Sequence, residues 1–300
     1  MPRSSSSREA RASKNKSLVL EARRLGRYMR LNNRPMTRSL GPRIEEEIPV
    51  YLGSNERLIT PAPVTDPADQ YYGSDGFADV EFPDLPSPNV TLLQNSAVQN
   101  MAALINRYPR EITLIALGPL TNVALLIKMY PAVRDNLKQI FIMGGNRHGV
   151  GNTESAAEFN FYSDPESANI VINNFEQSIT LLPWETASKE ELAIDRTWRF
   201  DVLGSADNPV VEILNAVESK VLRETDSWLP CDLLVPMVFA NPSLITDQKH
   251  YHGDVELYGG LTRGMLVLDY KNEGIGNIGV IDNINKTMVE MILLDLVSLP

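Results

Sequence analysis

The sequence predicts an α/β fold built on an open, doubly wound, mostly parallel sheet with helices on both faces. Short runs of aliphatic and β-branched residues recur along the chain, and segments with helical spacing separate many of them. Within these runs apolar residues do not alternate with polar ones, which is typical of strands buried on both faces of a parallel sheet. With 300 residues and 43% hydrophobic composition, the chain can bury a sizeable core as one domain.

Six runs are expected to form strands and six segments are expected to form helices. The strands are IPVYL (48–52), ITLIALG (112–118), QIFIMGG (139–145), SITLLPW (178–184), VELYG (255–259) and MLVLDY (265–270). The helices are 95–107, 119–130, 164–174, 209–224, 231–240 and 284–296. This arrangement predicts buried parallel strands joined by helices.

Charge is divided unevenly along the chain. Residues 1–43 contain twelve Lys or Arg and two acidic residues, whereas residues 44–300 contain 16 basic and 36 acidic residues, a difference of −20. Negative charge repels phosphate backbones, so we expect no nucleic-acid partner, while a metal ion or a neutral polar ligand is compatible. We interpret residues 1–43 as a basic Ser/Arg-rich tail or an aberrant N-terminus, and residues 44–300 as the folded domain.

Cysteine content and apolar run lengths bear on the compartment. Cys231 is the only cysteine, so no intramolecular disulfide is expected. No apolar run approaches the roughly 20 residues of a membrane span, and the first residues lack the apolar segment of a secretory signal. We therefore expect a cytoplasmic protein without a membrane partner. The Ser- and Arg-rich start also resembles an organellar transit peptide, which is the alternative.

Polar side chains gather where the expected strand 139–145 ends. Ligands of doubly wound sheets bind beyond the carboxyl ends of the strands, and the segment GNTESAAEFNFYSDPESA (151–168) follows directly on such an end. Asp164 precedes a Pro and is expected to cap a helix. Glu158 and Asn160 alternate with Phe159 and Phe161, so an extended backbone would direct both polar side chains to the same side.

Several motifs in this region resemble the inosine-uridine-preferring nucleoside hydrolases, in the same order and at similar spacing. They are IALGPLTNVALL (115–126), MGG (143–145), GNTESAAEFNFYSDPESA (151–168), PCDLLVPMVFANPSLIT (230–246) and TRGMLVLDY (262–270), with YYGSDGFADV (71–80) as a sixth. The resemblance covers roughly residues 44–300. It implies hydrolysis of the N-glycosidic bond of a ribonucleoside, a calcium ion held by carboxylates and carbonyls, a nucleoside or ribose ligand, and a homo-oligomer.

The resemblance also assigns individual residues. Asn152, Glu158 and Asn160 match the side chains that bind ribose, and Met143 matches a Met lining the sugar pocket. The carbonyl of Leu117 and the carboxylate of Asp232 match metal ligands. The alternative for Asp232 is an ordinary acidic residue at a helix N-terminus. For Asn122 in the GPLTN segment, a bond to local backbone is the favoured interpretation.

Cys231 and several aromatic residues are candidates for contact with the nucleobase. Cys231 stands where many family members have a His that assists the leaving base, and Tyr72 stands where a His is common. A thiol is a poor proton donor near neutral pH, and a small buried apolar role is the alternative for Cys231. Trp184, Trp198 and Trp228 could stack on a base, although a buried core position is the commoner role for Trp.

The chain departs from the family pattern in its first part. The family begins with a strand that ends in a DTDxGxDD run, which supplies two metal ligands and the catalytic base; residues 1–43 contain no Asp. The segment 15–29 resembles at most the family's first crossover helix, with Asn15 matching an Asn in the preceding turn, so we expect a first strand to be lacking. Calcium binds six to eight oxygens, which Asp232 and one carbonyl cannot supply. We therefore expect impaired hydrolysis, and three explanations stay open: a truncated or mispredicted N-terminus of a hydrolase gene, a catalytically silent relative that binds a ribose-like ligand, or a fragment completed by another chain.

Overall fold

The computed structural model describes residues 16–20, 51–54, 56–59, 72–73, 76–82, 97–175 and 179–298. For residues 16–20 it describes the backbone alone. Asn15 and residues 48–50 of the expected first strand lie outside these ranges.

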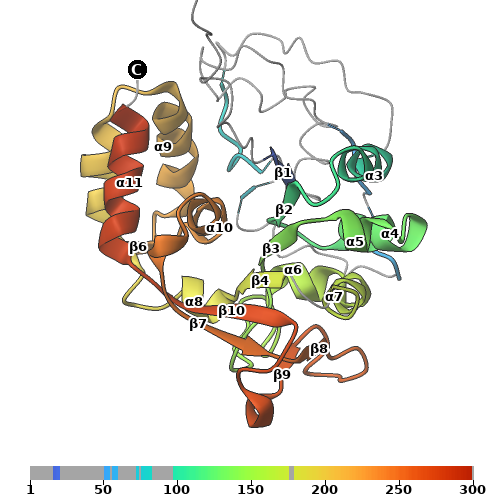
Figure 1. Ribbon diagram of the computed structural model, residues 1–300. Helices are drawn as coiled ribbons and strands as arrows, with labels where there is room; N and C mark the ends of the chain where they lie inside the picture. Colours follow the sequence, from blue (N-terminus) through green and yellow to red (C-terminus); the bar gives the residue numbers. More distant parts are fainter. Residues whose placement is uncertain are drawn as a thin grey trace, which may run out of the picture.

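A six-stranded, mostly parallel sheet forms the centre of the molecule (Figure 1). Its strands, in spatial order, are β1 (Lys16–Leu20), β2 (Ile112–Ala116), β3 (Gln139–Met143), β4 (Ile179–Leu182), β10 (Ile278–Ile284) and β7 (Ile245–Tyr251). All neighbouring pairs are parallel except β10 with β7, which is antiparallel. The predicted fold class is confirmed.

The apolar composition of the central strands follows from their burial on both faces. Every residue of β2 is buried, as are the last four residues of β3. Because side chains point alternately to the two faces of a strand, Leu114 joins one hydrophobic core while Ile115 joins the other. In the same way Ile142 faces the first core and Met143 the second.

Helices cover both faces of this sheet (Figure 1). The first core packs against α3 (Ala97–Arg107), α4 (Thr121–Met129), α5 (Val133–Asn136), α6 (Phe159–Ser163) and α7 (Pro165–Ile172). The second core packs against α8 (Trp184–Ala187), α9 (Pro209–Val221), α10 (Cys231–Ala240) and α11 (Lys286–Ser298). Asp164 and Asn208 each cap the helix that follows and are each followed by Pro, which suits the first helical turn.

Shorter elements complete the described part. They are β5 (Ile194–Asp195), β6 (Ser227–Trp228), β8 (Gly253–Val255), β9 (Leu266–Leu268), η2 (Trp198–Val202), η3 (Leu203–Ser205), η4 (Pro242–Leu244) and η5 (Tyr270–Asn272). β5 pairs with β6, and β8 pairs with β9, both antiparallel and apart from the main sheet. No helix among the described residues is long and apolar enough to cross a membrane.

Three expectations for individual elements were wrong. The runs 255–259 and 265–270 were expected as parallel strands of the main sheet, but only Val255 and Leu266–Leu268 are in strands, and these belong to the separate β8–β9 pair. The strands β7 and β10 were missed. Of the segment 15–29, expected to resemble a crossover helix, the structure describes only Lys16–Leu20, which is a strand that pairs with β2 where the sequence suggested no strand. Residues 21–29 lie outside the described ranges.

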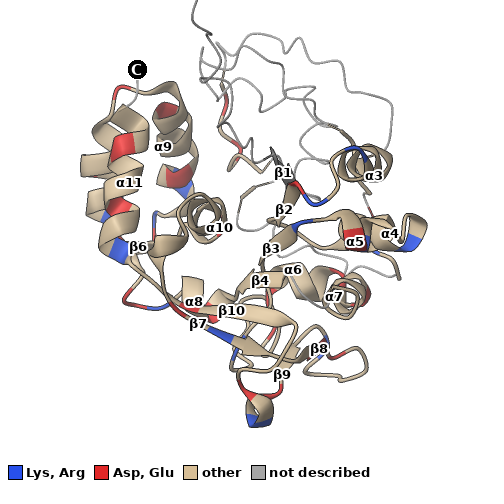
Figure 2. Cartoon of the chain, in the orientation of Figure 1, with Lys and Arg blue, Asp and Glu red and all other residues tan. Residues whose placement is uncertain are grey.

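Charged residues are spread over the described elements, with acidic residues on both α9 and α11 (Figure 2). The charged side chain of Arg199 is fully buried: its Nε donates to Glu218 Oε2 at 2.7 Å, and its Nη1 donates to Asn215 Oδ1 at 2.8 Å. The indole N–H of Trp228 donates to the other oxygen of Glu218 at 3.0 Å. Burial raises the pKa of Glu218, while the Arg199 charge lowers it. This network joins η2, α9 and β6.

Replacing Glu218 by Gln is expected to lower the free energy of unfolding by about 3 kcal/mol, because it leaves the Arg199 charge buried without its counter-ion. Urea unfolding followed by circular dichroism measures the change. Glu224→Gln, at an exposed position just after α9, is the matched control and should have little effect. Equal effects of the two substitutions would contradict the expectation.

Candidate functional site

Glu158 is a buried carboxylate at the start of α6, with 1% of its surface exposed. Its Oε1 accepts the backbone N–H of Asn160 at 2.8 Å. Its Oε2 accepts the N–H of Gly145 at 2.9 Å and of Phe161 at 3.1 Å. Burial raises the pKa of Glu158 to about 7, the three N–H donors oppose this, and the nearby Asp232 charge adds to the rise. The carboxyl therefore joins the end of β3 to the start of α6.

The Gly144–Gly145 pair allows the backbone to pass this close to Glu158. Their φ angles are 152° and 68°, and residues other than glycine rarely adopt such positive values. A Cβ atom on Gly144 would lie 2.9 Å from the Phe161 ring and 3.1 Å from Glu158 Oε2. The two glycines after Met143 are thus required by the packing of Phe161 and Glu158 against the turn.

Asn160 and Met143 lie together at the end of β3. The amide nitrogen of Asn160 donates to the carbonyl of Met143 at 3.0 Å and approaches its Sδ at 3.6 Å. Both residues are buried. The predicted neighbourhood of Met143, Glu158 and Asn160 is present in the structure; their roles toward a sugar stay predictions.

The first turn of α10 brings Cys231 and Asp232 to the same place. Both are half-buried, and Asp232 raises the pKa of Glu158, so the two carboxylates are close enough to interact. Burial raises the pKa of the Cys231 thiol to about 12, with contributions from Asp232 and Glu158. The thiol donates to the carbonyl of Leu229 at 3.4 Å. Cys231 is therefore a neutral thiol at physiological pH and no thiolate nucleophile.

The side chains of Asn152 and Asp164 accept hydrogen bonds from backbone N–H groups. The exposed side chain of Asn152 accepts the N–H of Phe159 at 2.8 Å. Asp164 caps α7 by accepting the N–H of Ser167 at 3.2 Å. It also accepts the hydroxyl of Thr121 at 2.5 Å, which places the GPLTN segment against the helix. The capping interpretation of Asp164 is borne out.

Asn122 stabilises a more distant segment than expected. Its side-chain oxygen accepts the N–H of Ser54 at 2.8 Å, a residue 68 positions earlier, in place of a bond to local backbone. Its side-chain nitrogen is buried and has no hydrogen-bond partner among the described residues. A Cβ on Gly53 would lie 2.5 Å from that nitrogen, so Gly53 packs directly on the amide.

The described residues do not fit a calcium ion. Among them no group of three or more His, Cys, Asp or Glu is placed to hold a metal. Glu158 already accepts three N–H donors, which leaves Asp232 and the carbonyl of Leu117 from the predicted set. Calcium takes six to eight oxygen ligands, so this part of the chain offers too few.

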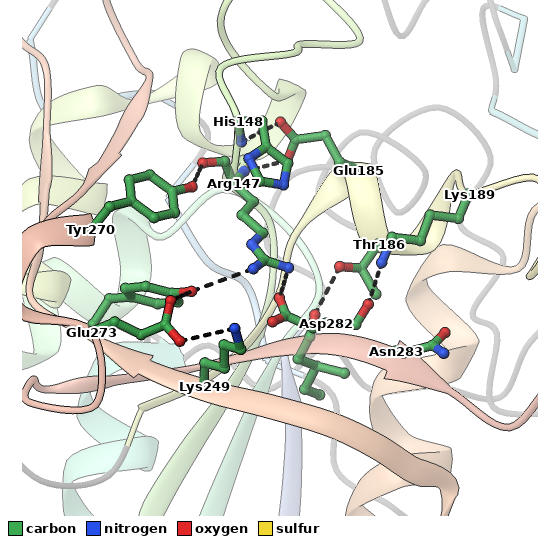
Figure 3. A network of polar contacts seen from close by, with 12 residues as sticks. Arg147, His148, Glu185, Thr186, Lys189, Lys249, Tyr270, Glu273, Asp282 and Asn283 are labelled. Atoms are coloured by element: carbon green, nitrogen blue, oxygen red, sulfur yellow. Dashed lines mark hydrogen bonds and ion pairs between the residues drawn. The ribbon is translucent and has the colours of Figure 1, made fainter.

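A second carboxylate next to β3 was missed by the sequence reasoning. Glu185, just after β4, accepts the N–H groups of Arg147, His148 and Val150 in the loop that leaves β3 (Figure 3). The Arg147 side chain forms an ion pair with Asp282 of β10. Glu185 directly follows the expected strand 178–184, and its place at that carboxyl end was the one available signal.

The three Trp residues and the TRGM segment make packing and ion-pair contacts within the fold. Trp228 is buried, and Trp184 and Trp198 pack partly buried against the second core. Arg263 of the TRGM segment forms an ion pair with Glu166 of α7 at 2.6 Å. Two motifs that are about 100 residues apart in the sequence are thus adjacent in space.

Known proteins are similar to this chain in sequence. A family model for the inosine-uridine preferring nucleoside hydrolases matches residues 31–291. The pyrimidine-specific ribonucleoside hydrolase RihA of Salmonella newport (strain SL254) is 33% identical over 207 residues, covering 68% of this chain and 65% of the relative. RihA of Escherichia coli (strain K12) is 32% identical over 228 residues, covering 75% of this chain and 70% of the relative. The chain thus spans about two thirds of the length of these curated relatives.

Solved structures agree in fold. A plant nucleoside hydrolase, the PpNRh1 enzyme, superimposes with a TM-score of 0.73 at 24% identity, covering 84% of this chain and 81% of its own. A purine-preferring ribonucleoside hydrolase from Gardnerella vaginalis gives a TM-score of 0.72 at 20% identity, covering 84% and 80%. These likenesses show the fold, and the family model adds the sequence pattern. The chain belongs to the inosine-uridine preferring nucleoside hydrolase family.

Proposed function

We propose that this chain binds a ribonucleoside by its ribose at the end of β3, and that it hydrolyses the N-glycosidic bond far more slowly than a family member with a complete carboxylate set. The observation that carries the proposal is the buried Glu158 and Asn160 pair, which lies next to Met143 and where the Asp232 charge acts on Glu158. The family hydrolyses this bond, and the two RihA relatives are named for pyrimidine ribonucleosides.

Glu158 suits a neutral sugar better than a cation. Its pKa of about 7 means that the carboxyl is partly protonated at neutral pH. The protonated form can donate a hydrogen bond to a ribose oxygen while its oxygens still accept backbone N–H groups. Asn160 is fixed by its bond to the Met143 carbonyl and retains its side-chain oxygen as an acceptor. The pair therefore offers both a donor and an acceptor to a diol.

Slow hydrolysis follows from what the chain lacks for the chemical step. Departure of the base leaves an oxocarbenium-like ribosyl cation and needs a base to activate water. The chain contains no DTDxGxDD run, which supplies that base in the family. Cys231, with a pKa of about 12, is a poor acid for the leaving base at neutral pH. The residues support binding of the sugar more than its attack.

Binding without calcium is part of the same proposal. Asp232 and the Leu117 carbonyl are too few ligands to hold calcium by themselves. A ribose bound through Glu158 and Asn160 uses hydrogen bonds that need no metal. We therefore propose that nucleoside affinity is the same with calcium and with a chelator.

Calorimetric titration with inosine and with uridine tests the binding, and Asn160→Ala is expected to raise Kd about tenfold by removing one fixed hydrogen-bonding group. The exposed Asn106→Ala is the matched control and should leave Kd unchanged. Reducing-sugar release, assayed beside RihA of Escherichia coli, should be far slower for this chain. No heat with either nucleoside would overturn the binding, and turnover similar to RihA would overturn the slow hydrolysis.

The buried Glu158 also predicts a pH dependence of stability. Its folded-state pKa of about 7 exceeds the reference value of 4.5, so the folded protein binds more protons than the unfolded chain between these values. The free energy of unfolding should therefore fall as pH rises from 5 to 8, by on the order of 3 kcal/mol from this group at most.

Glu158→Gln is the variant that isolates this contribution. Gln cannot titrate, so its unfolding free energy should lack the part of the slope that Glu158 supplies. At pH 5 the variant should be less stable than the unmodified protein, because a Gln side chain has only one oxygen for three backbone N–H donors. Urea unfolding at half-unit pH steps measures both, and an identical slope in the two proteins would contradict the assignment.

A further inference from the structure

The loop that follows β3 is bound by the Glu185 carboxylate, which comes from a different segment of the chain. One oxygen of Glu185 accepts the N–H of Arg147, and the other accepts the N–H of His148 at 2.7 Å and of Val150 at 3.0 Å. Glu185 lies in α8, directly after β4, the neighbour of β3 in the sheet. One side chain therefore fixes three backbone groups within four residues.

The side chain of Arg147 fixes the same loop a second time. Its guanidinium forms an ion pair with Asp282, whose side chain is 3% exposed, and approaches the Tyr251 hydroxyl at 3.3 Å. Burial raises the pKa of Asp282, while the Arg147 charge lowers it. The Tyr270 hydroxyl donates to the Arg147 carbonyl (Figure 3). Arg147, Glu185 and Asp282 together are called the loop clamp below.

The loop clamp lies next to the residues that contact Glu158. Gly145, two positions before Arg147, donates its N–H to Glu158. Asn146, between them, donates its side chain to the Ala156 carbonyl at 2.7 Å and accepts the Leu266 N–H at 2.9 Å. The Gly145 carbonyl accepts the N–H of Trp184 at 3.0 Å, directly before Glu185. The path from the loop clamp to Glu158 is thus continuous and short.

We propose that Glu185 is a positioning residue: through the loop clamp it fixes the path of residues 144–151 and so places Glu158 and Asn160 against the ribose. This inference rests on the proposed function and deepens it. Glu185 needs no contact with the nucleoside. Its charge fits the role, since a carboxylate receives three N–H groups that a neutral side chain cannot all satisfy.

Glu185→Gln tests the proposal. The amide oxygen replaces only one carboxylate oxygen, and its NH₂ group then faces a backbone donor. Amide hydrogen exchange in peptides covering 144–151 should become at least about tenfold faster, while exchange in β2 and β4 stays the same. The Kd for inosine should rise about tenfold because the sugar-binding groups are less well placed. Glu190→Gln, an exposed acid in the segment after α8, is the matched control and should change neither quantity.

A second variant separates positioning from folding. Glu185→Asp keeps the charge on a side chain one methylene shorter, and should give intermediate exchange and intermediate affinity with an unchanged urea midpoint. If Glu185→Gln fails to fold, Glu185→Asp alone decides. Exchange and affinity equal to those of the unmodified protein would overturn the proposal.

The proposal and the proposed function fail in different ways. If the unmodified protein binds no inosine, the proposed function fails, and the exchange experiment still reports whether Glu185 fixes the loop. If inosine binds and Glu185→Gln loosens the loop without changing Kd, nucleoside binding stands and the positioning role is refuted.

Discussion

The candidate site depends on the bonds between the buried Glu158 carboxylate and three backbone N–H groups. A buried carboxyl group is costly unless its oxygens are paired, and here Gly145, Asn160 and Phe161 pair them. These bonds fix the turn after β3 and the start of α6 relative to each other. The placement of Asn160 follows, because it is two residues from Glu158 and its side chain returns to the Met143 carbonyl.

Other carboxylates near the strand ends also accept several hydrogen bonds from backbone N–H groups. Asp164 accepts two backbone N–H groups and the Thr121 hydroxyl, and Glu185 accepts three N–H groups from the loop after β3. Loops at the end of a parallel sheet leave many backbone groups outside regular structure, and carboxylates satisfy several of them at once. The acidic composition of residues 44–300 therefore includes acids that act as acceptors for backbone. The number of acidic residues therefore does not indicate how many could bind a metal.

Much of the fold could be predicted because its central strands are apolar on both faces. β2, β3 and β4, and helices such as α9 and α10, were expected within a few residues of their bounds. β7 was missed because the polar residues Asp247, Gln248 and Lys249 interrupt it, and it pairs antiparallel with one side partly exposed. Glu158 and Asn160 were found because strand ends can be located from periodicity. Glu185 was not singled out, since its partners lie 35 to 38 residues away and no local spacing indicates them.

Residues of the matched motifs pack against one another, so the motifs have a structural role in addition to any chemical one. Thr121 of GPLTN binds Asp164 of the DPESA segment, and Arg263 of TRGM binds Glu166 of the same segment. Each pair fastens loops of the sheet edge whether or not a nucleoside is cleaved. Substituting either member would leave a partly buried polar group without its partner, so these contacts contribute to stability whatever the activity of the chain. Family membership alone therefore does not establish activity, which must be judged from the residues that would touch the sugar, the water and the base.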